Sequence, residues 1–319
     1  MNMNSTTHFK IIKTSLIFAA LFGLNACSSD NSSTTVNGRG ADETLTKGTL
    51  TISLTDAAVD SAQEVLVQFN GVSIKPSDGD AFNILFDDVK NIDLLSLQGT
   101  KSADLISNRI IPPGSYDWIR LLVNAEQDGI NDSYIRLNDG SIHEFSIPSG
   151  SQTGLKINYS FELTTIKALS LMIDFDLRKS VVLSSGEYKL RPTLRMVDMA
   201  DVGSISGTIE SELVTATNCS DTDPATYNVV YLFEGHNVIP DDLDNKKPEA
   251  LTSDIVELNL SSGLYEYEIG FIPTGDYTIA FTCQSDLDTL KNNEEIVFSL
   301  VDNITVISDE NDILINPVR

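Results

Sequence analysis

Glu64–Ile74 reads EVLVQFNGVSI, and its apolar side chains recur at every second position. Successive side chains of a β-strand point to opposite faces, so Val65, Val67 and Phe69 share one face if the stretch is extended. The same period of two marks Tyr116–Ala125 (YDWIRLLVNA), where Ile, Leu and Val alternate with Trp, Arg and Leu. The pattern predicts a chain whose core is built from β-strands.

Helical content is expected to be small. Asp56–Glu64 (DAAVDSAQE) can begin with Asp56 as an N-cap and form one or two helical turns. Asn91–Ile106 (NIDLLSLQGTKSADLI) can hold a short helix that is interrupted at Gly99. Neither stretch is long enough to change the predicted class.

The pattern shifts near Ala200–Gly203, where a second run of alternating segments begins. We expect the later strands at Ser204–Ile209, Val229–Phe233, Leu264–Ile269, Tyr277–Cys283, Glu295–Leu300 and Ile304–Val306. The sequence therefore predicts an all-β protein with two β-sandwich domains of Ig-like or prealbumin-like type. Their expected limits are residues 48–200 and 201–319.

One short motif occurs in both predicted domains. Ile111–Tyr116 reads IPPGSY, and Ile272–Tyr277 reads IPTGDY, each followed by an alternating segment. Proline sets φ for a turn, glycine permits a positive φ, and the tyrosine can pack and bond back across the corner. We expect the same turn to lead into a core strand in both domains.

The first residues have the features of an export signal. Lys10 and Lys13 precede an apolar segment, Ser15–Leu24, that is shorter than the roughly 20 residues of a membrane-spanning helix. Leu24-Asn25-Ala26-Cys27 then resembles the lipobox of bacterial lipoproteins, which implies a signal peptide at 1–26 and a lipid on Cys27. An ordinary cleaved signal with an incidental cysteine is the alternative.

The segment that follows is expected to be a tether. Residues 27–47 are mostly Ser, Thr, Asn, Asp and Gly, which bury too little apolar surface to fold. Ser28 and Ser29 follow the cysteine with no Asp, and by resemblance to known sorting rules this favours the outer membrane. No later segment reaches about 18 apolar residues. The expected location is the cell envelope, with the lipid as the membrane contact.

The charge of the chain limits its partners. The formal net charge is −25, and loss of Lys10 and Lys13 with the signal peptide would make it −27. Such a surface repels nucleic acid and favours solubility or divalent cations. A solvated acidic surface that resists aggregation explains the composition equally well.

Cys219 and Cys283 are the cysteines left after the lipid site. Outside the cytoplasm a lone pair most simply forms a disulfide, which would stabilise its domain by about 4 kcal/mol in the chain-entropy model. Two free thiols or a metal pair are the alternatives, although no CxxC spacing supports the latter.

Several segments together resemble the DUF4382 domain of exported bacterial lipoproteins, over about residues 48–198. They are GTLTISLTDA at 48–57, IDLL at 92–95, Gly114–Tyr116 with Trp118–Arg120, SGSQTGLK at 149–156, IDFDLRKS at 173–180 and YKLRPTL at 188–194. That family has no established activity, so the resemblance implies no catalytic residues. The second domain is similar to carboxypeptidase regulatory-like, prealbumin-type sandwiches, on Gly203–Gly207, Ser262–Tyr265 and the Ile272–Tyr277 turn.

Motifs for catalysis are missing from the sequence. The mature chain has His143 and His236 in unrelated contexts, without HExxH, a GxSxG elbow, a P-loop or a dinucleotide fingerprint. Acidic clusters in expected loops could bind Ca²⁺, but polar turns are rich in Asp anyway and none has EF-hand spacing. These clusters are Asp78–Asp80, Asp87–Asp88, Asp128–Asp132, Asp221–Asp223 and Asp241–Asp242 with Asp244.

One charged strand face is the candidate recognition surface. Asp174, Asp176 and Arg178 alternate along one expected strand, and Lys189, Arg191 and Arg195 could lie opposite on a neighbour. The face could be a solvated, salt-bridged surface or a polar recognition site, with Ser149–Lys156 as an adjoining loop. Trp118 beside Arg120 could add a stacking platform.

The sequence thus predicts a non-catalytic, membrane-anchored lipoprotein with a structural or ligand-binding role. The alternative is a carbohydrate-binding or calcium-dependent surface adhesion module. We expect a glycan or an envelope protein as partner, no nucleic acid, and no cofactor unless the acidic loops bind Ca²⁺.

Overall fold

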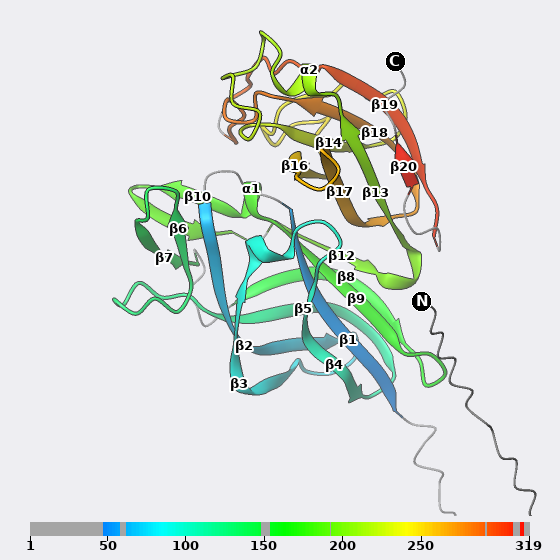
Figure 1. The fold of residues 1–319 in the computed structure, drawn as a ribbon. Helices are drawn as coiled ribbons and strands as arrows, with labels where there is room; N and C mark the ends of the chain where they lie inside the picture. The colour runs from blue at the N-terminus through cyan, green and yellow to red at the C-terminus, as the bar shows by residue number, and fades with distance from the viewer. Residues whose placement is uncertain are drawn as a thin grey trace, which may run out of the picture. The chain divides into compact units, whose positions relative to one another are not determined.

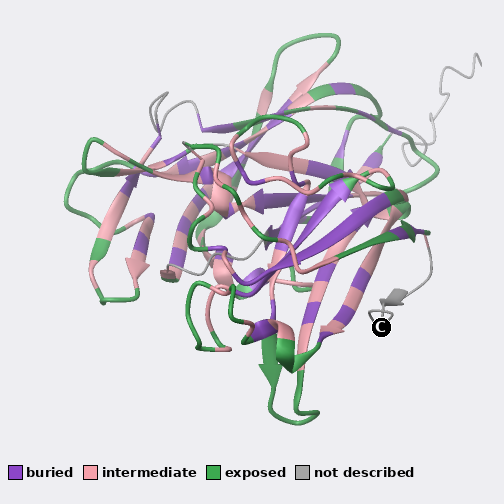
Figure 2. Cartoon of the chain, turned by 90° about the horizontal axis from the view of Figure 1, so that it is seen from above, coloured by how far each residue is buried: buried purple, intermediate pink, exposed green. Residues whose placement is uncertain are grey.

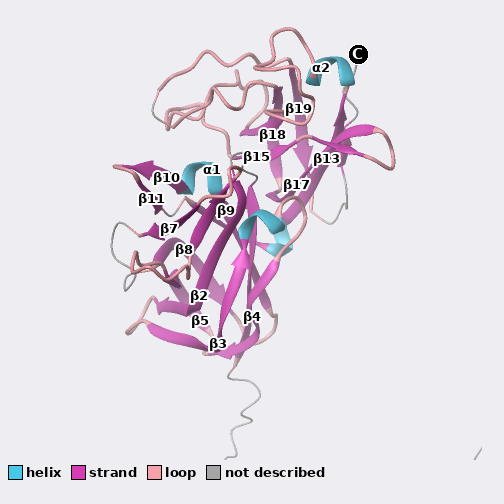
Figure 3. Cartoon of the chain, turned by 60° about the vertical axis from the view of Figure 1, so that its left-hand side comes forward, coloured by secondary structure: helices cyan, strands magenta, loops and turns pink. Residues whose placement is uncertain are grey.

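A computed structural model describes residues 47–57, 62–147, 154–191, 193–290, 292–308 and 313–315. Regular structure in these residues is nearly all β-sheet, and the helices are turns of three or four residues (Figures 1 and 3). The strands form four sheets, two before residue 200 and two after it. The protein is therefore all-β, with an N-terminal sandwich (β1–β12) and a C-terminal sandwich (β13–β20). The exact domain limits stay a prediction.

The first sheet of the N-terminal sandwich has the strand order β12–β9–β1–β4. These strands span Leu194–Asp198, Leu169–Asp176, Gly48–Ala57 and Ala103–Ile111, respectively. β1 runs parallel to β9 and antiparallel to β4. A parallel pair needs a long crossover, and here most of the second sheet lies between β1 and β9 in sequence.

The second sheet has the order β10–β11–β7–β6–β2–β5–β8, with β3 also paired to β2. In this order the strands span Val181–Ser184, Glu187–Leu190, Ile142–Ser146, Tyr134–Leu137, Ala62–Pro76, Gly114–Asn124 and Leu155–Leu163, and β3 spans Phe82–Asp93. The long strand β2 contains the EVLVQFNGVSI stretch and pairs with β3, β5 and β6. It is the central strand of the sheet.

The alternation in β2 is confirmed, with one change of phase. Val65, Val67 and Phe69 are fully buried, but beyond them the buried aliphatic side chains fall at even positions, including Val72. A β-bulge between Phe69 and Gly71 inserts the extra residue that shifts the pattern. A Cβ at Gly71 would lie 2.4 Å from the carbonyl oxygen of Ile84 in β3, so only glycine fits there.

The two sheets enclose one continuous hydrophobic core. The rings of Phe69 in β2 and Phe175 in β9 meet edge to face across it, with centroids 6.3 Å apart. Buried and half-buried residues alternate along the strands, as Figure 2 shows. The alternation expected in Tyr116–Ala125 is confirmed too, because Ile119, Leu121 and Val123 are buried.

The helix predicted over Asp56–Glu64 is wrong for the residues described there. Asp56 and Ala57 end β1, where Asp56 pairs with Phe175 of β9, and Ala62 begins β2. Sheet pairing overrides a weak local helix preference. Of the helix predicted within 91–106, only the 3₁₀ turn η2 (Leu94–Leu97) forms, where the Asp93 side chain accepts from the backbone N–H of Leu95.

The N-terminal sandwich also has the short helix α1 (Leu177–Ser180), and the 3₁₀ turn η4 (Met199–Asp201) leads to the C-terminal sandwich. There one sheet has the order β16–β17–β13–β20, spanning Glu257–Asn259, Leu264–Pro273, Val202–Ile209 and Ile313–Ile315. The other has the order β15–β14–β18–β19, spanning Thr252–Ile255, Val229–Glu234, Gly275–Thr282 and Leu300–Val306. Helix α2 is a single turn at Ser211–Val214.

The last two predicted strands need correction. Glu295–Leu300 and Ile304–Val306 were expected to be separate, whereas the structure has one strand, β19, that starts at Leu300. Phe298 instead packs against the rings of Tyr231 and Phe233, at centroid distances of 5.7 and 6.3 Å. The apolar side chain that suggested a strand serves to cover a sheet face.

Strand β14 (VVYLFE) is buried on both faces. Val230 and Leu232 face the core between the two sheets, while Val229, Tyr231 and Phe233 belong to a second, separate cluster. That second cluster lies under the segments 235–251 and 283–299, which we call the loop layer. A continuous apolar run is typical of a strand covered on both sides.

The corner motif is confirmed in both sandwiches. The Tyr116 hydroxyl donates to the carbonyl oxygen of Pro112 at 2.5 Å, and the Tyr277 hydroxyl donates to that of Pro273 at 2.8 Å. In each case the motif joins two consecutive strands, β4 to β5 and β17 to β18. The two corners are built in the same way.

The structure tests only part of the membrane prediction. No helix in the described part of the chain is both long and apolar enough to cross a membrane. The signal peptide, Cys27 and residues 28–46 of the tether lie outside the described residues.

Candidate functional site

The charged face predicted around Asp174 lies at a contact between the two sandwiches. Asp174 is only 5% exposed, and it pairs with Arg195 directly across β9 and β12, with Nη2 to Oδ2 at 2.7 Å. Arg195 also donates to the carbonyl oxygen of Phe271 in β17, at 3.2 Å. Of the three cations expected opposite the aspartates, only Arg195 is on a strand next to β9.

Arg178 does not continue that alternation, because β9 ends at Asp176 and Arg178 lies in α1. Its guanidinium donates to the carbonyl oxygen of Ser285 at 3.1 Å and lies 3.8 Å from Asp288. The next residue, Lys179, is 3.0 Å from Asp176 and donates to the backbone of the loop layer. Helix α1 therefore presents two cations to the C-terminal sandwich.

The other candidate residues lie elsewhere. Trp118 and Arg120 are half-buried neighbours on β5, with the guanidinium carbon 4.9 Å from the ring centroid, and Lys156 lies 5.0 Å from the same ring. Arg191 is exposed just after β11, and residues 149–153 of the expected adjoining loop lie outside the described residues. The candidate residues thus do not form one exposed surface. A ligand for any of them stays a prediction.

The predicted disulfide is confirmed. Cys219 and Cys283 are bonded, with their Cα atoms 4.9 Å apart. The backbone N–H of Ser220 also donates to the carbonyl oxygen of Cys283, at 3.2 Å. Since Cys283 follows directly on β18, the bond holds the start of the second segment of the loop layer.

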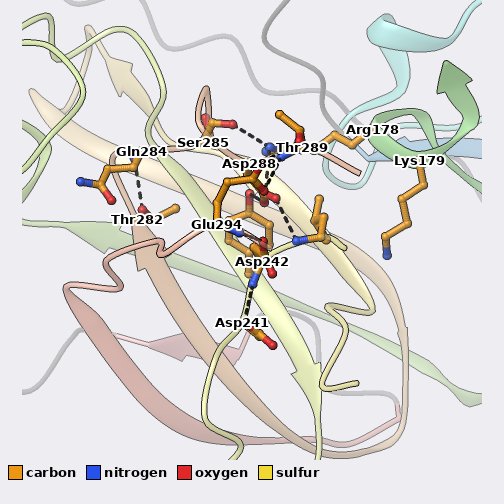
Figure 4. A network of polar contacts seen from close by, with 12 residues as sticks. Arg178, Lys179, Asp241, Asp242, Thr282, Gln284, Ser285, Asp288, Thr289 and Glu294 are labelled. Atoms are coloured by element: carbon orange, nitrogen blue, oxygen red, sulfur yellow. Dashed lines mark hydrogen bonds and ion pairs between the residues drawn. The ribbon is translucent and has the colours of Figure 1, made fainter. Parts of the chain in front are cut away.

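Three carboxylates meet in the loop layer. Asp242 lies between β14 and β15, while Asp288 and Glu294 lie between β18 and β19. One oxygen of each lies within 4.8 Å of the others. Figure 4 shows the three side chains together, with Arg178 approaching from α1. We call Asp242, Asp288 and Glu294 the acidic centre.

Asp288 is the fixed member of the acidic centre. Its side chain is fully buried, at 0% exposure. Oδ2 accepts from the Tyr231 hydroxyl at 2.6 Å, and Oδ1 accepts from the backbone N–H of Leu243 at 2.8 Å. Because Tyr231 is on β14, these bonds tie both segments of the loop layer to the sheet beneath them.

Asp242 is also buried, at 1% exposure, and its Oδ2 accepts from the backbone N–H of Glu294. Its Oδ1 has no hydrogen-bond partner. Burial raises the pKa of Asp242. A hydrogen bond between its carboxyl group and that of Glu294 adds to the effect, followed by the charges of Asp241 and Asp244. A buried acceptor without a partner is unfavourable, so this oxygen is available to a cation or a proton.

Glu294 is the half-exposed member. Burial opposes its ionisation, but hydrogen bonds outweigh this effect and lower its pKa, those from the Thr289 hydroxyl and backbone N–H foremost. Lys246 pairs with Asp244 nearby. The acidic centre could hold a hard cation, because all of its donor atoms are oxygens.

The sequence identified only part of this centre. Asp242 belongs to one of the acidic clusters considered for Ca²⁺, whereas Asp288 and Glu294 were not singled out. They come from a different loop, and no spacing motif joins the two loops. Only the antiparallel pairing of β14 with β18, together with the loop that returns from β14 to β15, brings them together.

A cleft of about 600 Å³ lies next to the acidic centre. Its lining includes Tyr188 of β11, Tyr227, Arg178 and Asp288. Tyr227 has φ of 59°, a left-handed conformation that is uncommon for a residue with a side chain. Such outliers cluster at functional sites, and the cleft is of the size that small ligands occupy.

Comparison with protein families gives a match for most of the first sandwich. Residues 47–192 match the family described as a domain of unknown function, DUF4382. The match confirms the expected resemblance for this part of the chain. It ends just before β12, which the structure includes in the first sheet of the same sandwich. The lipoprotein signal and the prealbumin-like second domain stay predictions.

Other comparisons add no function. A search of curated proteins gives no match. Among solved structures, the Bacillus anthracis TIE protein is 13% identical with a TM-score of 0.18, over 85% of this chain and 33% of its own. The major pilin subunit of Bacillus cereus is 10% identical at 0.19, over 85% and 69%. A proposed cell adhesion protein of Bacteroides eggerthii is 11% identical at 0.20, over 85% and 86%.

These similarities support no statement about the fold or the function of this chain, because their TM-scores are far below 0.5. The chain also spans only about a third of the Bacillus anthracis protein's length. The fold described above therefore rests on the sheets themselves.

Proposed function

We propose that the protein is a non-catalytic module of the cell envelope, held at a membrane by a lipid on Cys27. The disulfide between Cys219 and Cys283 is the observation that carries this proposal. Disulfides persist in oxidising compartments and are rare in the cytoplasm. The lipobox at Leu24–Cys27 supplies the route to such a compartment and a covalent anchor.

The surroundings of the two histidines support a non-catalytic role. The ring of His143 lies against that of Tyr188, tilted by 40° with centroids 5.0 Å apart, and the Ser141 hydroxyl is 3.1 Å from its Nε2. His236 is in the other sandwich, 3.5 Å from Asp276 and 3.2 Å from the carbonyl oxygen of Ile304. Both histidine rings therefore make structural contacts within their own sandwich.

The anchor is tested by metabolic labelling of the full chain with radioactive palmitate in a bacterial host. Wild-type protein should be labelled and should sediment with membranes, whereas Cys27→Ser should lose the label. The matched control replaces both disulfide cysteines with serine, which removes two thiols but leaves Cys27 intact, so its label should stay. Labelling of Cys27→Ser would contradict the anchor.

Carbohydrate binding is a second candidate function, favoured by the cleft lined by Tyr188 and Tyr227. Tyrosine rings offer flat apolar faces, and the nearby Arg178 guanidinium can donate hydrogen bonds to hydroxyl groups. A glycan panel with wild-type protein, Tyr227→Ala and Trp118→Ala separates the two aromatic surfaces. Loss of glycan binding in Tyr227→Ala alone would support the cleft as the carbohydrate site. Loss of binding in Trp118→Ala alone, or no binding by the wild-type protein, would exclude the cleft as that site.

A further inference from the structure

We propose that Asp242, Asp288 and Glu294 form a Ca²⁺ site in the loop layer of the C-terminal sandwich. The proposal concerns the folded C-terminal sandwich and does not depend on the lipid anchor. It assigns the ion to one place among several acidic clusters of the sequence.

The geometry of the acidic centre fits a single ion. Oxygens bound to Ca²⁺ at about 2.3–2.6 Å lie at most about 5 Å apart. The three carboxylates meet this condition, since one oxygen of each lies within 4.8 Å of the others. Within the described residues, this is the group of acidic, His or Cys side chains that reaches such a spacing.

The buried oxygen of Asp242 is an independent indication of a ligand. The side chain is 1% exposed, and Oδ1 has no hydrogen-bond partner. An oxygen removed from water without a partner is unfavourable, and it is more so when it carries charge. A bound cation would supply the missing partner and offset the repulsion among the three carboxylates.

The donor atoms favour Ca²⁺ over other metals. All are carboxylate oxygens, whereas structural Zn²⁺ sites use Cys and His. Mg²⁺ requires a near-ideal octahedron at about 2.0–2.1 Å, while Ca²⁺ accepts irregular sets of six to eight oxygens. The acidic centre lies between two loops. Because Glu294 is half-exposed, water can reach the ion and fill its remaining coordination positions.

The cations near the acidic centre offset only part of its charge. Arg178 forms a buried salt bridge with Asp288, at 3.8 Å, which leaves the charges of Asp242 and Glu294 without a cation of their own. Lys246 pairs with Asp244 rather than with a member of the centre. Asp241 adds a further negative charge. The local charge therefore favours a divalent cation.

The test uses the full chain, purified in detergent and treated with EDTA. Terbium(III) is the direct probe, because it replaces Ca²⁺ at oxygen sites and is excited through nearby tyrosine. Tyr231 donates a hydrogen bond to Asp288, so terbium in the acidic centre should emit on tyrosine excitation. Ca²⁺ should displace it and should raise the thermal unfolding midpoint.

Two variants and a control locate the ion. Asp242→Asn and Glu294→Gln should each weaken Ca²⁺ binding by about tenfold or more, because each removes a charged ligand. Glu294 is half-exposed, so its variant is expected to fold even if the buried Asp242→Asn does not. The matched control is Asp80→Asn, which removes an equal charge from an exposed turn of the N-terminal sandwich and should bind as wild type.

Three results would overturn the proposal. Wild type with no terbium emission and no Ca²⁺ stabilisation would mean that a proton satisfies Asp242. Equal Ca²⁺ affinity in wild type and Glu294→Gln would place the ion elsewhere. Stabilisation by Mg²⁺ that matches or exceeds that by Ca²⁺ would contradict the choice of metal.

Discussion

The two sandwiches share a corner motif but are stabilised in different ways. The N-terminal sandwich has one continuous core between a four-stranded and an eight-stranded sheet, and it contains no cysteine. The C-terminal sandwich has two smaller cores, because one of its sheets is covered by the other sheet on one side and by the loop layer on the other. It also has the disulfide and the acidic centre.

The difference shows how a small sandwich with long loops remains ordered. Long strands such as β2 bury enough apolar surface to form a core without a cross-link. The loop layer packs only a small apolar cluster onto its sheet, so its conformation also depends on the disulfide and on the bonds of Asp288 and Asp242. Small domains with limited cores commonly rely on such additional links.

The largest effect is expected in the core of the N-terminal sandwich. Phe175→Ala removes a fully buried ring and should lower the free energy of unfolding by about 3–5 kcal/mol. Trp118 is the only tryptophan and lies in β5, so its fluorescence in urea reports this sandwich. Ile110→Ala is the control, because Ile110 is 59% exposed and should change stability by less than about 0.5 kcal/mol. Equal losses of unfolding free energy in the two variants would mean that burial in the core does not dominate the stability of this sandwich.

One buried carboxyl group should make the stability of the C-terminal sandwich depend on pH. Burial raises the pKa of Asp254 in β15 from 3.8 to about 7, and the carboxylates of Glu257 and Glu268 add to the shift. Between about pH 4 and 7 the folded state holds a proton that the unfolded state releases. The contribution of this group to stability is therefore full below about pH 4. It falls by up to about 1.4 kcal/mol per pH unit as pH rises to 7.

Urea unfolding followed by circular dichroism at several pH values measures this slope. Asp254→Asn cannot ionise and should be less sensitive to pH than wild type over that interval. The backbone N–H of Glu268 donates to Asp254 Oδ2 at 2.8 Å, and an amide oxygen can accept the same bond. Identical slopes for wild type and variant would mean that Asp254 does not titrate there.

The smallest effects concern the shared corner. Tyr116→Phe and Tyr277→Phe each remove one hydroxyl that donates to a proline carbonyl oxygen four residues earlier. Each should cost about 1 kcal/mol in its own sandwich, the usual net value of one hydrogen bond. Thermal unfolding of the two variants provides the comparison. A large cost in only one of them would show that the corners are not equivalent.

The sequence predicted the strands well because alternation is a local property. Val65, Val67 and Phe69 are buried as expected, and the disulfide followed from having one pair of cysteines left after the lipid site. The phase change at Gly71 was not predicted, since a bulge depends on the neighbouring strand. The corner motif was predicted because its residues are adjacent in sequence.

The site was predicted less well because it depends on contacts between distant segments. Asp174 looked like part of an exposed face, but β17 supplies the partner that covers Arg195. The apolar residues before Leu300 looked like a strand, but Phe298 covers Tyr231. Asp242 and Asp288 come from separate loops, and only the sheet topology brings them together.

Hydrogen exchange of the full chain, followed by mass spectrometry, tests the contrast between the sandwiches most directly. The comparison is between wild type and the variant with Cys219→Ser and Cys283→Ser. A loss of about 4 kcal/mol corresponds to roughly a thousand-fold faster exchange in the most protected amides. We predict this acceleration in residues 202–306, with protection of residues 48–198 unchanged. Equal loss in both sandwiches, or no change in the C-terminal one, would contradict the account.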